Sequence, residues 1–179
     1  MAFIEIGFNA KRPLILGRGG FGTQLNDWLM DEGWGSADFL DDNAPDAVGG
    51  LRDYVDPAIL KRGRPAFAAL GDNKLRVELL QKLAAAGYST PVFISDAASV
   101  SPSAVLEPGC IILPQAYVGA DAHRGVGCIV NAGAIVDHNA HLGRGVHVAP
   151  GGIVKASAEV AEFDKVDSGE IVRSPWENQ

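Results

Sequence analysis

The last part of the chain, from about residue 100 onward, repeats with a period of six residues. Of the thirteen residues at this spacing from Val100 to Val172, twelve are aliphatic and one is Arg124. The residue four places after each is small or compact through ten consecutive hexads, from Ala104 to Ala158. Neither an α-helix, with its period of about 3.6, nor a strand, with its period of about 2, produces this pattern. A six-residue repeat is typical of a parallel β-helix, whose aliphatic residues fill the interior and whose small residues occupy the tight corners.

Composition narrows the classes of partner. A chain of 179 residues has room for one or two small domains with a real core. The net charge of -7 argues against nucleic acid as a partner. No stretch approaches the roughly 20 apolar residues of a membrane span. The first residues also lack the cationic and then apolar pattern of a signal peptide. We therefore expect a cytoplasmic protein without membrane partners.

Three residues within the repeat region call for an explanation of their own. Cys110 and Cys128 occupy the small position of two hexads eighteen residues apart, so they stack on adjacent coils if three hexads make one coil. A spacing of about 4.8 Å permits a disulfide, but buried free cysteine is a common core residue and cytosolic chains rarely oxidise. We favour a packing role. Arg124 takes an inward position, where an unpaired guanidinium is costly, so we expect it to reach a carboxylate or to distort its coil.

The first half of the chain follows a different pattern. Strands are expected at residues 13–16, 37–40, 66–70 and 91–94, and helices at 23–32 and from about 75 to Gly87. This alternation predicts a small Rossmann-like parallel sheet. We therefore expect an α/β domain over residues 1–96 and a β-helix domain over residues 97–179. No low-complexity linker separates the two, which indicates that they pack together.

A glycine-rich loop joins the first strand to the first helix. Its glycines are Gly17, Gly19, Gly20 and Gly22. Glycines at this place allow a tight turn and leave the amides of the helix N-terminus to meet a phosphate. Asp41 and Asp42 follow about twenty residues later, where a ribose or base contact is expected. The loop alone is equally consistent with a plain strand-to-helix turn, and the neighbouring elements favour nucleotide binding.

The second helix begins at a similar junction. Asp72 or Asn73 is expected to cap it, and Arg76 is a candidate for a further phosphate contact.

All four histidines lie in the repeat region. His123 and His141 are eighteen residues apart and are expected to stack on one face, while His147 belongs to the next face. His138 is the third residue of its hexad, near a corner and directed away from the interior. Asp137 beside it is placed to orient the ring or hold its tautomer. Imidazole, with an ordinary pKa of about 6.5, is the natural general base at neutral pH. For any single histidine, a solvated position or a contact between subunits is the alternative.

Five stretches resemble one known family in the family's own order. They are residues 16–22, 39–42, 69–76, 99–104 and 131–147, and together they span most of residues 13 to 160. The family is that of the nucleotide-sugar acyltransferases of the sialic acid O-acetyltransferase and UDP-4-amino-sugar N-acetyltransferase type. The resemblance implies a left-handed β-helix and a homotrimer with active sites between neighbouring subunits. It also implies acetyl-CoA as the donor and a nucleotide-linked amino sugar as the acceptor.

The resemblance assigns roles by position. It makes His138 the general base, with Asp137 beside it, and places His147 and Ala156 against acetyl-CoA, with no metal. The residues it places at the substrate are Gly17, Gly19, Gly20, Phe21, Gly22, Asp41, Asp42 and Asn131. In this mechanism His138 removes a proton from the acceptor amine or hydroxyl as that atom attacks the thioester. A backbone N–H stabilises the oxyanion.

Two further features depart from the family pattern. Phe21 stands where members usually carry a histidine. At the end of the repeat the small position becomes Asp164 and then Glu170, and the closing segment at residues 166–176 arrives roughly two coils early. The coils that are missing usually help to form the pantetheine groove.

Two alternative functions remain open from the sequence. One is a non-catalytic trimer that binds a nucleotide sugar and has lost the donor site, as Phe21 and the shortened repeat suggest. The other is a metal lyase similar to the γ-carbonic anhydrases, with His123 and His141 of one chain and His147 of another around zinc.

Overall fold

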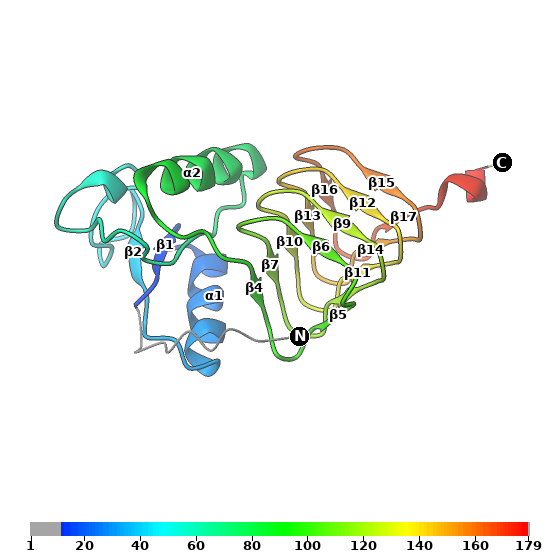
Figure 1. Cartoon of the computed structure of the whole chain (residues 1–179), viewed down its shortest axis with the longest axis horizontal. Helices are drawn as coiled ribbons and strands as arrows, with labels where there is room; N and C mark the ends of the chain where they lie inside the picture. Colours follow the sequence, from blue (N-terminus) through cyan, green and yellow to red (C-terminus); the bar gives the residue numbers. More distant parts are fainter. Residues whose placement is uncertain (1–11, 179) are drawn as a thin grey trace.

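The second half of the chain forms a left-handed parallel β-helix of two-residue strands (Figure 1). The computed structural model describes residues 12–178. The strands are β4 (Phe93–Ile94), β5 (Ser99–Val100), β6 (Val105–Leu106), β7 (Ile111–Ile112), β8 (Tyr117–Val118), β9 (His123–Arg124), β10 (Ile129–Val130), β11 (Ile135–Val136), β12 (His141–Leu142), β13 (His147–Val148), β14 (Ile153–Val154), β15 (Glu159–Val160), β16 (Lys165–Val166) and β17 (Ile171–Val172). From β5 onward, every strand ends at a residue of the six-residue repeat, as predicted.

Three parallel sheets form the faces of the β-helix. The first face is β4-β7-β10-β13-β16, the second is β5-β8-β11-β14-β17, and the third is β6-β9-β12-β15. Residues eighteen apart pair directly, as Val130 does with Val148, so three hexads make one coil. The aliphatic residues and the small residues of the repeat form one buried cluster in the interior, which confirms the expected packing.

The corners of the coils impose a second requirement on the repeat. From Gly109 to Gly169, every sixth residue has a positive φ between 55° and 74°, which makes eleven such residues. Six of them are glycine, which adopts this left-handed conformation without strain, and two are Asn139 and Asp121, which tolerate it. The repeat therefore specifies the turn residue as well as the interior.

The end of the repeat coincides with the last coil of the described chain. Asp164 and Glu170 replace small residues there and are exposed, since no further coil within residues 12–178 stacks on them. Glu170 accepts a hydrogen bond from the backbone N–H of Asp167 at 2.7 Å. The 3₁₀ helix η2 (Pro175–Asn178) follows.

The N-terminal part is a three-stranded parallel sheet between two helices. Its elements are β1 (Leu14–Leu16), α1 (Gly20–Asp31), β2 (Asp38–Leu40), the 3₁₀ helix η1 (Asp53–Val55), β3 (Ala66–Ala68) and α2 (Asn73–Ala86), with strand order β2-β1-β3. Alternate residues of β1 face opposite layers: Leu14 and Leu16 pack with residues of α2, and Ile15 packs with residues of α1. Three of the four predicted strands are confirmed. Asp72 accepts a hydrogen bond from the backbone N–H of Leu75, so the predicted cap of α2 is confirmed.

The predicted fourth strand, at residues 91–94, does not belong to this sheet. Phe93 and Ile94 form β4, which pairs with Ile111 and Ile112 of β7. A short apolar run carries no sign of which sheet it joins, and here it begins the first face of the β-helix. The strand pairing of the β-helix therefore starts before residue 97, where we expected the second domain to begin.

The first face of the β-helix is covered by the N-terminal part (Figure 1). Ile15 and Leu25 share a buried cluster with Phe93, Ile111 and Ile129. The Arg76 side chain reaches from α2 to two successive coils, donating to Gly127 O at 2.8 Å and Gly145 O at 2.6 Å. The idea that Arg76 contacts phosphate is therefore wrong, because this side chain is completely buried between the two parts.

In the described part of the chain, Arg124 neither reaches a carboxylate nor distorts its coil, so both outcomes that we expected are wrong. It is completely buried, its strand pairs regularly with β6 and β12, and its guanidinium nitrogens have no hydrogen-bond partner among the described residues. Burial lowers the pKa of Arg124 to about 10. The cysteines match the expectation: Cys110 and Cys128 are free and buried, and their thiols donate to Gly125 O and Gly143 O.

Within residues 12–178, no helix is long and apolar enough to cross a membrane.

Candidate functional site

The glycines of the loop between β1 and α1 have two different roles. Gly17 has φ +100° and lies against Ala69 and Leu70 just after β3, and a Cβ on Gly22 would be 1.9 Å from Gly17 O. Both are therefore required by packing. Cβ atoms on Gly19 and Gly20, by contrast, would meet nothing within 4 Å. These two exposed glycines leave open space at the start of α1, whose N-cap has no side-chain hydrogen bond.

The predicted aspartates lie beside this loop. Asp41 accepts hydrogen bonds from the backbone N–H groups of Arg18 at 2.7 Å and Asn43 at 2.8 Å, and these bonds lower the pKa of its carboxyl. Asp42 accepts from the backbone N–H of Leu51 at 2.8 Å. The structure thus joins Asp41 directly to the glycine loop, whereas Asp42 holds the next loop in place.

Phe21, Asn131 and His147 come together where α1 meets the first face. The Phe21 ring centroid lies 6.3 Å from that of His147. Asn131 Nδ2 lies 3.2 Å from His147 Nε2, while Asn131 Oδ1 accepts from the backbone N–H of Ala132 at 2.8 Å. Three predicted site residues that are distant in sequence therefore share one location.

The surroundings of His147 fix its protonation state. Burial, with the nearby charges of Arg76 and Lys165, lowers the pKa of His147 to about 4. The ring is thus neutral at pH 7. Because Asn131 Oδ1 is already engaged, its Nδ2 donates to His147 Nε2, which places the ring proton on Nδ1. His147 can therefore act as a hydrogen-bond donor through Nδ1.

His138 lies on another part of the surface, at the corner between the second and third faces. Its side chain is exposed, as predicted. Its Nδ1 lies 2.9 Å from Asn139 Nδ2, whereas Asp137 Oδ1 accepts from the backbone N–H of His138 at 2.7 Å. Within residues 12–178, the ring partner is therefore Asn139, and Asp137 holds the backbone of the turn instead of the ring. Asn139 occupies the left-handed position of this corner.

Ala156 stacks on His138 one coil further along. The pairing of Val136 with Val154 places these corners in register, and the backbone N–H of Ser157 donates to His138 O at 3.0 Å. Ala156 therefore occupies the position directly above His138 in the stack of corners. The predicted general base and one predicted acetyl-CoA contact are therefore neighbours.

Gly119 supports the His138 turn from the coil below. A Cβ at this position would lie 2.5 Å from the backbone nitrogen of His138. The sequence pattern alone did not single out Gly119 as a support of this turn. The signal is a glycine directly after an interior residue of the repeat, which recurs at Gly125 and Gly143 under similarly close turns.

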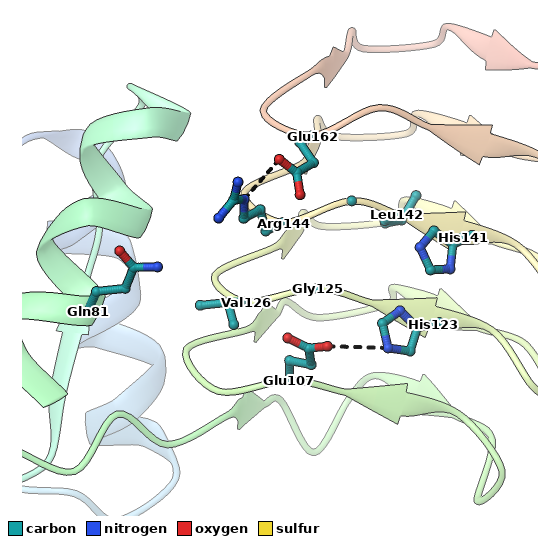
Figure 2. Close-up of a pocket in the computed structure, with 10 residues that line it drawn as sticks. Gln81, Glu107, His123, Gly125, Val126, His141, Leu142, Arg144 and Glu162 are labelled. Carbon is teal, nitrogen blue, oxygen red and sulfur yellow. Dashed lines mark ion pairs between the residues drawn. The ribbon is translucent and has the colours of Figure 1, made fainter.

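A third cluster lines a groove of about 370 Å³ between α2 and the third face (Figure 2). His123 and His141 stack there with ring centroids 4.8 Å apart, and His123 Nε2 lies 3.4 Å from Glu107 Oε1. The prediction that these two histidines stack on one face, with His147 on the next, is confirmed. In residues 12–178 no three His, Cys, Asp or Glu residues are arranged to hold a metal ion.

The comparisons with known proteins bear on both parts of the chain. Residues 13–83 match the PglD N-terminal domain family. No curated protein matches the chain significantly.

Solved structures match over most of the chain. The acetyltransferase domain of PglB from Neisseria gonorrhoeae, in complex with acetyl coenzyme A, is 28% identical with a TM-score of 0.84, and the match covers 92% of this chain and 82% of that one. A mutant of perosamine N-acetyltransferase from Caulobacter crescentus, in complex with CoA and GDP-perosamine, is 28% identical with a TM-score of 0.80, covering 86% and 76%. PerB from the same organism, in complex with the same two ligands, is 25% identical with a TM-score of 0.70, covering 87% and 91%.

Proposed function

We propose that this chain, which belongs to the nucleotide-sugar acyltransferases with a PglD N-terminal domain, transfers an acetyl group from acetyl-CoA to an amine or hydroxyl of a nucleotide-linked sugar. The observation that carries the proposal is the likeness, over 92% of the chain, to an acetyltransferase domain in complex with acetyl coenzyme A. The likeness to a perosamine N-acetyltransferase in complex with CoA and GDP-perosamine adds the class of acceptor.

The glycine loop is the proposed nucleotide site. Open space at Gly19 and Gly20 adjoins the N-terminus of α1, where backbone N–H groups and the helix dipole favour phosphate. The loop lies at the carboxyl end of the parallel strands, which is where ligands bind in open α/β sheets. From there the sugar would extend toward Phe21, Asn131 and His147.

His138 is the proposed general base. When the Asn139 amide is turned so that Oδ1 accepts from Nδ1–H, the Nε2 lone pair of His138 points to solvent and can take a proton. The acceptor amine or hydroxyl loses that proton as it attacks the thioester carbonyl. The tetrahedral intermediate then expels the CoA thiolate, which takes the proton from the imidazolium. A backbone N–H stabilises the oxyanion.

The complete site requires a second copy of the chain. The nucleotide loop, Asn131 and His147 lie with the covered first face, whereas His138 and Ala156 lie at the corner between the other two faces. The outward residues of the second face include Tyr117, Ile135 and Ile171, all exposed and apolar. Such a ladder is suited to burial between subunits. We therefore assign the chain to a homotrimer in which His138 of one subunit meets the nucleotide site of the next.

An assay with labelled acetyl-CoA and a panel of nucleotide amino sugars tests this function. We expect transfer by the unmodified protein and a fall in kcat of about 10²–10⁴-fold for His138→Ala, the usual contribution of a general base. His141→Ala is the matched control, because it removes another exposed histidine three residues away, and we expect this variant to keep its activity. Undiminished transfer by His138→Ala would contradict the role of His138. Binding of a nucleotide sugar without any transfer would instead support the non-catalytic alternative.

A further inference from the structure

Arg18 occupies the glycine loop, and its side chain lies across the carboxyl end of the sheet. The Cζ atom is 4.6 Å from the centroid of the Phe39 ring in β2. Nη1 donates to Thr23 Oγ1 in the first turn of α1 at 2.5 Å. The backbone N–H of Arg18 is bound by Asp41. The guanidinium is therefore held between β2 and α1, next to the open space at Gly19 and Gly20.

The remaining edge of the guanidinium has a weak partner. Nε at 3.2 Å and Nη2 at 3.0 Å both approach a single oxygen, Asp46 Oδ2. The Asp46 side chain is 61% exposed and that of Arg18 is 27% exposed. An ion pair whose carboxylate is this exposed to solvent contributes little to stability. A ligand with more negative charge and two suitably placed oxygens can take the place of Asp46.

We propose that Arg18 binds the diphosphate of the nucleotide-linked substrate, and that Asp46 pairs with its guanidinium until that diphosphate displaces it. A guanidinium fork matches two phosphate oxygens, and such charge-assisted pairs are stronger than a pair with one carboxylate oxygen. The stack on Phe39 and the bond to Thr23 hold the fork in place before the ligand arrives. This inference rests on the proposed function, since it names a residue of the same nucleotide site.

The two residues of the pair are predicted to act in opposite directions. Loss of Arg18 removes a contact to the ligand and weakens diphosphate binding. Loss of the Asp46 charge removes a competitor and strengthens it. If the pair only held the two loops together, both substitutions would disturb the same loops and change affinity in the same direction.

Calorimetric titration with UDP and with GDP tests this inference. For whichever diphosphate the unmodified protein binds, we expect Arg18→Ala to raise Kd at least about tenfold and Arg18→Lys to raise it less, because lysine keeps the charge without the fork. Asp46→Asn is expected to lower Kd by about twofold or more as the competing charge is lost. Arg144→Ala is the matched control: this arginine also lies over a phenylalanine ring, at 5.3 Å from Phe163, and pairs with Glu162 at 2.9 Å, but it lies on the β-helix.

Each outcome decides a separate question. Equal affinity of Arg18→Ala and the unmodified protein overturns the role of Arg18 and leaves the proposed function standing. A weakening by Asp46→Asn as large as that by Arg18→Ala shows that the pair positions the loops and overturns the displacement. If the folded, unmodified protein binds neither diphosphate nor any nucleotide sugar, the proposed function fails. Thermal unfolding of every variant confirms that it is folded.

Discussion

Arg76 and Arg124 are both completely buried, and their surroundings differ. Arg76 donates to four acceptors, two of which are carbonyls of successive coils. The guanidinium of Arg124 has no hydrogen-bond partner among the described residues and lies in the apolar interior. A buried charge with satisfied donors holds elements together, whereas one without partners carries its full desolvation penalty. The extent of burial alone therefore does not determine how much a charged residue contributes to the stability of the fold.

Replacing the two arginines is predicted to have opposite effects on stability. Arg124→Met removes an unpaired buried charge and is expected to raise the free energy of unfolding by about 1–3 kcal/mol. Arg76→Met leaves the carbonyls of Leu70, Gly127 and Gly145 and the Asn73 Oδ1 without this donor and is expected to lower it by about 3–5 kcal/mol. Urea unfolding measures both. A loss of stability in Arg124→Met would show that its guanidinium has a partner in solution.

His147 is predicted to make the fold acid-sensitive. Its pKa in the folded chain is about 4, against an ordinary value of about 6.5. Between these values the unfolded chain takes up a proton that the folded chain does not, so the free energy of unfolding falls as the pH drops from about 6.5 to about 4. Urea unfolding at pH 7 and pH 5 should show a smaller fall for His147→Gln than for the unmodified protein. Equal falls would mean that His147 titrates normally when folded.

At the scale of elements, the proposed functional residues lie in the turns between elements, and the strands form the scaffold that holds those turns. The loop from β1 to α1 needs glycine at Gly17 and Gly22 for packing, and only Gly19 and Gly20 face open space. The turn from β11 to β12 presents His138, with Asn139 in the left-handed position and Gly119 beneath it. In both turns, glycines that are required by packing allow the backbone conformation that leaves Gly19 and Gly20, or His138, exposed.

Substitution of two loop glycines should separate stability from binding. Gly22→Ala places a Cβ 1.9 Å from Gly17 O, and we expect this steric overlap to lower the free energy of unfolding by about 2 kcal/mol or more. Gly20→Ala meets no neighbour, keeps stability and reduces nucleotide binding by filling ligand space. Thermal unfolding and titration with UDP or GDP measure the two effects. Similar destabilisation by Gly22→Ala and Gly20→Ala would contradict the separation of packing glycines from ligand-facing glycines.

Gly119→Ala is predicted to impair catalysis through the His138 turn. Its Cβ would lie 2.5 Å from the His138 backbone nitrogen, so we expect the turn that carries the imidazole to shift. Displacement of a catalytic group by about 1 Å can reduce the rate about 10²-fold. We expect kcat to fall while the Kd for the nucleotide sugar stays unchanged, because the nucleotide loop lies with the first face. An unchanged kcat would show that the turn accommodates the methyl group.

At the scale of the whole molecule, the repeat predicted more than the scattered site residues did. The six-residue period gave the coils, the interior and the exposure of His138, because each depends only on spacing. Three features were not predictable in this way. The sheet joined by residues 91–94 depends on a long-range choice between two partners. The burial of Arg76 depends on how the two parts dock. The ring partner of His138 is Asn139 because the corner conformation brings it there.

The division of the site between chains is the central claim about the whole molecule. Each half of the site lies on a different surface, and a homotrimer is the proposed means of joining them. If the claim is correct, a chain with an intact His138 and a different chain with an intact nucleotide loop together form an active site. A site contained in one chain could not be restored in this way.

Complementation between two inactive variants is the most direct test of a site that is shared between subunits. His138→Ala lacks the base, and Gly20→Trp fills the nucleotide site from a position with open space around it. We expect each alone to be inactive. Trimers reassembled from equal amounts of the two variants should recover about one quarter of the unmodified activity. Each site then has a chance of about one half of receiving an intact His138 from one chain and, independently, the same chance of receiving an intact nucleotide loop from the next. Mixed trimers, confirmed by native mass spectrometry, that show no activity above that of either parent would contradict a site shared between subunits.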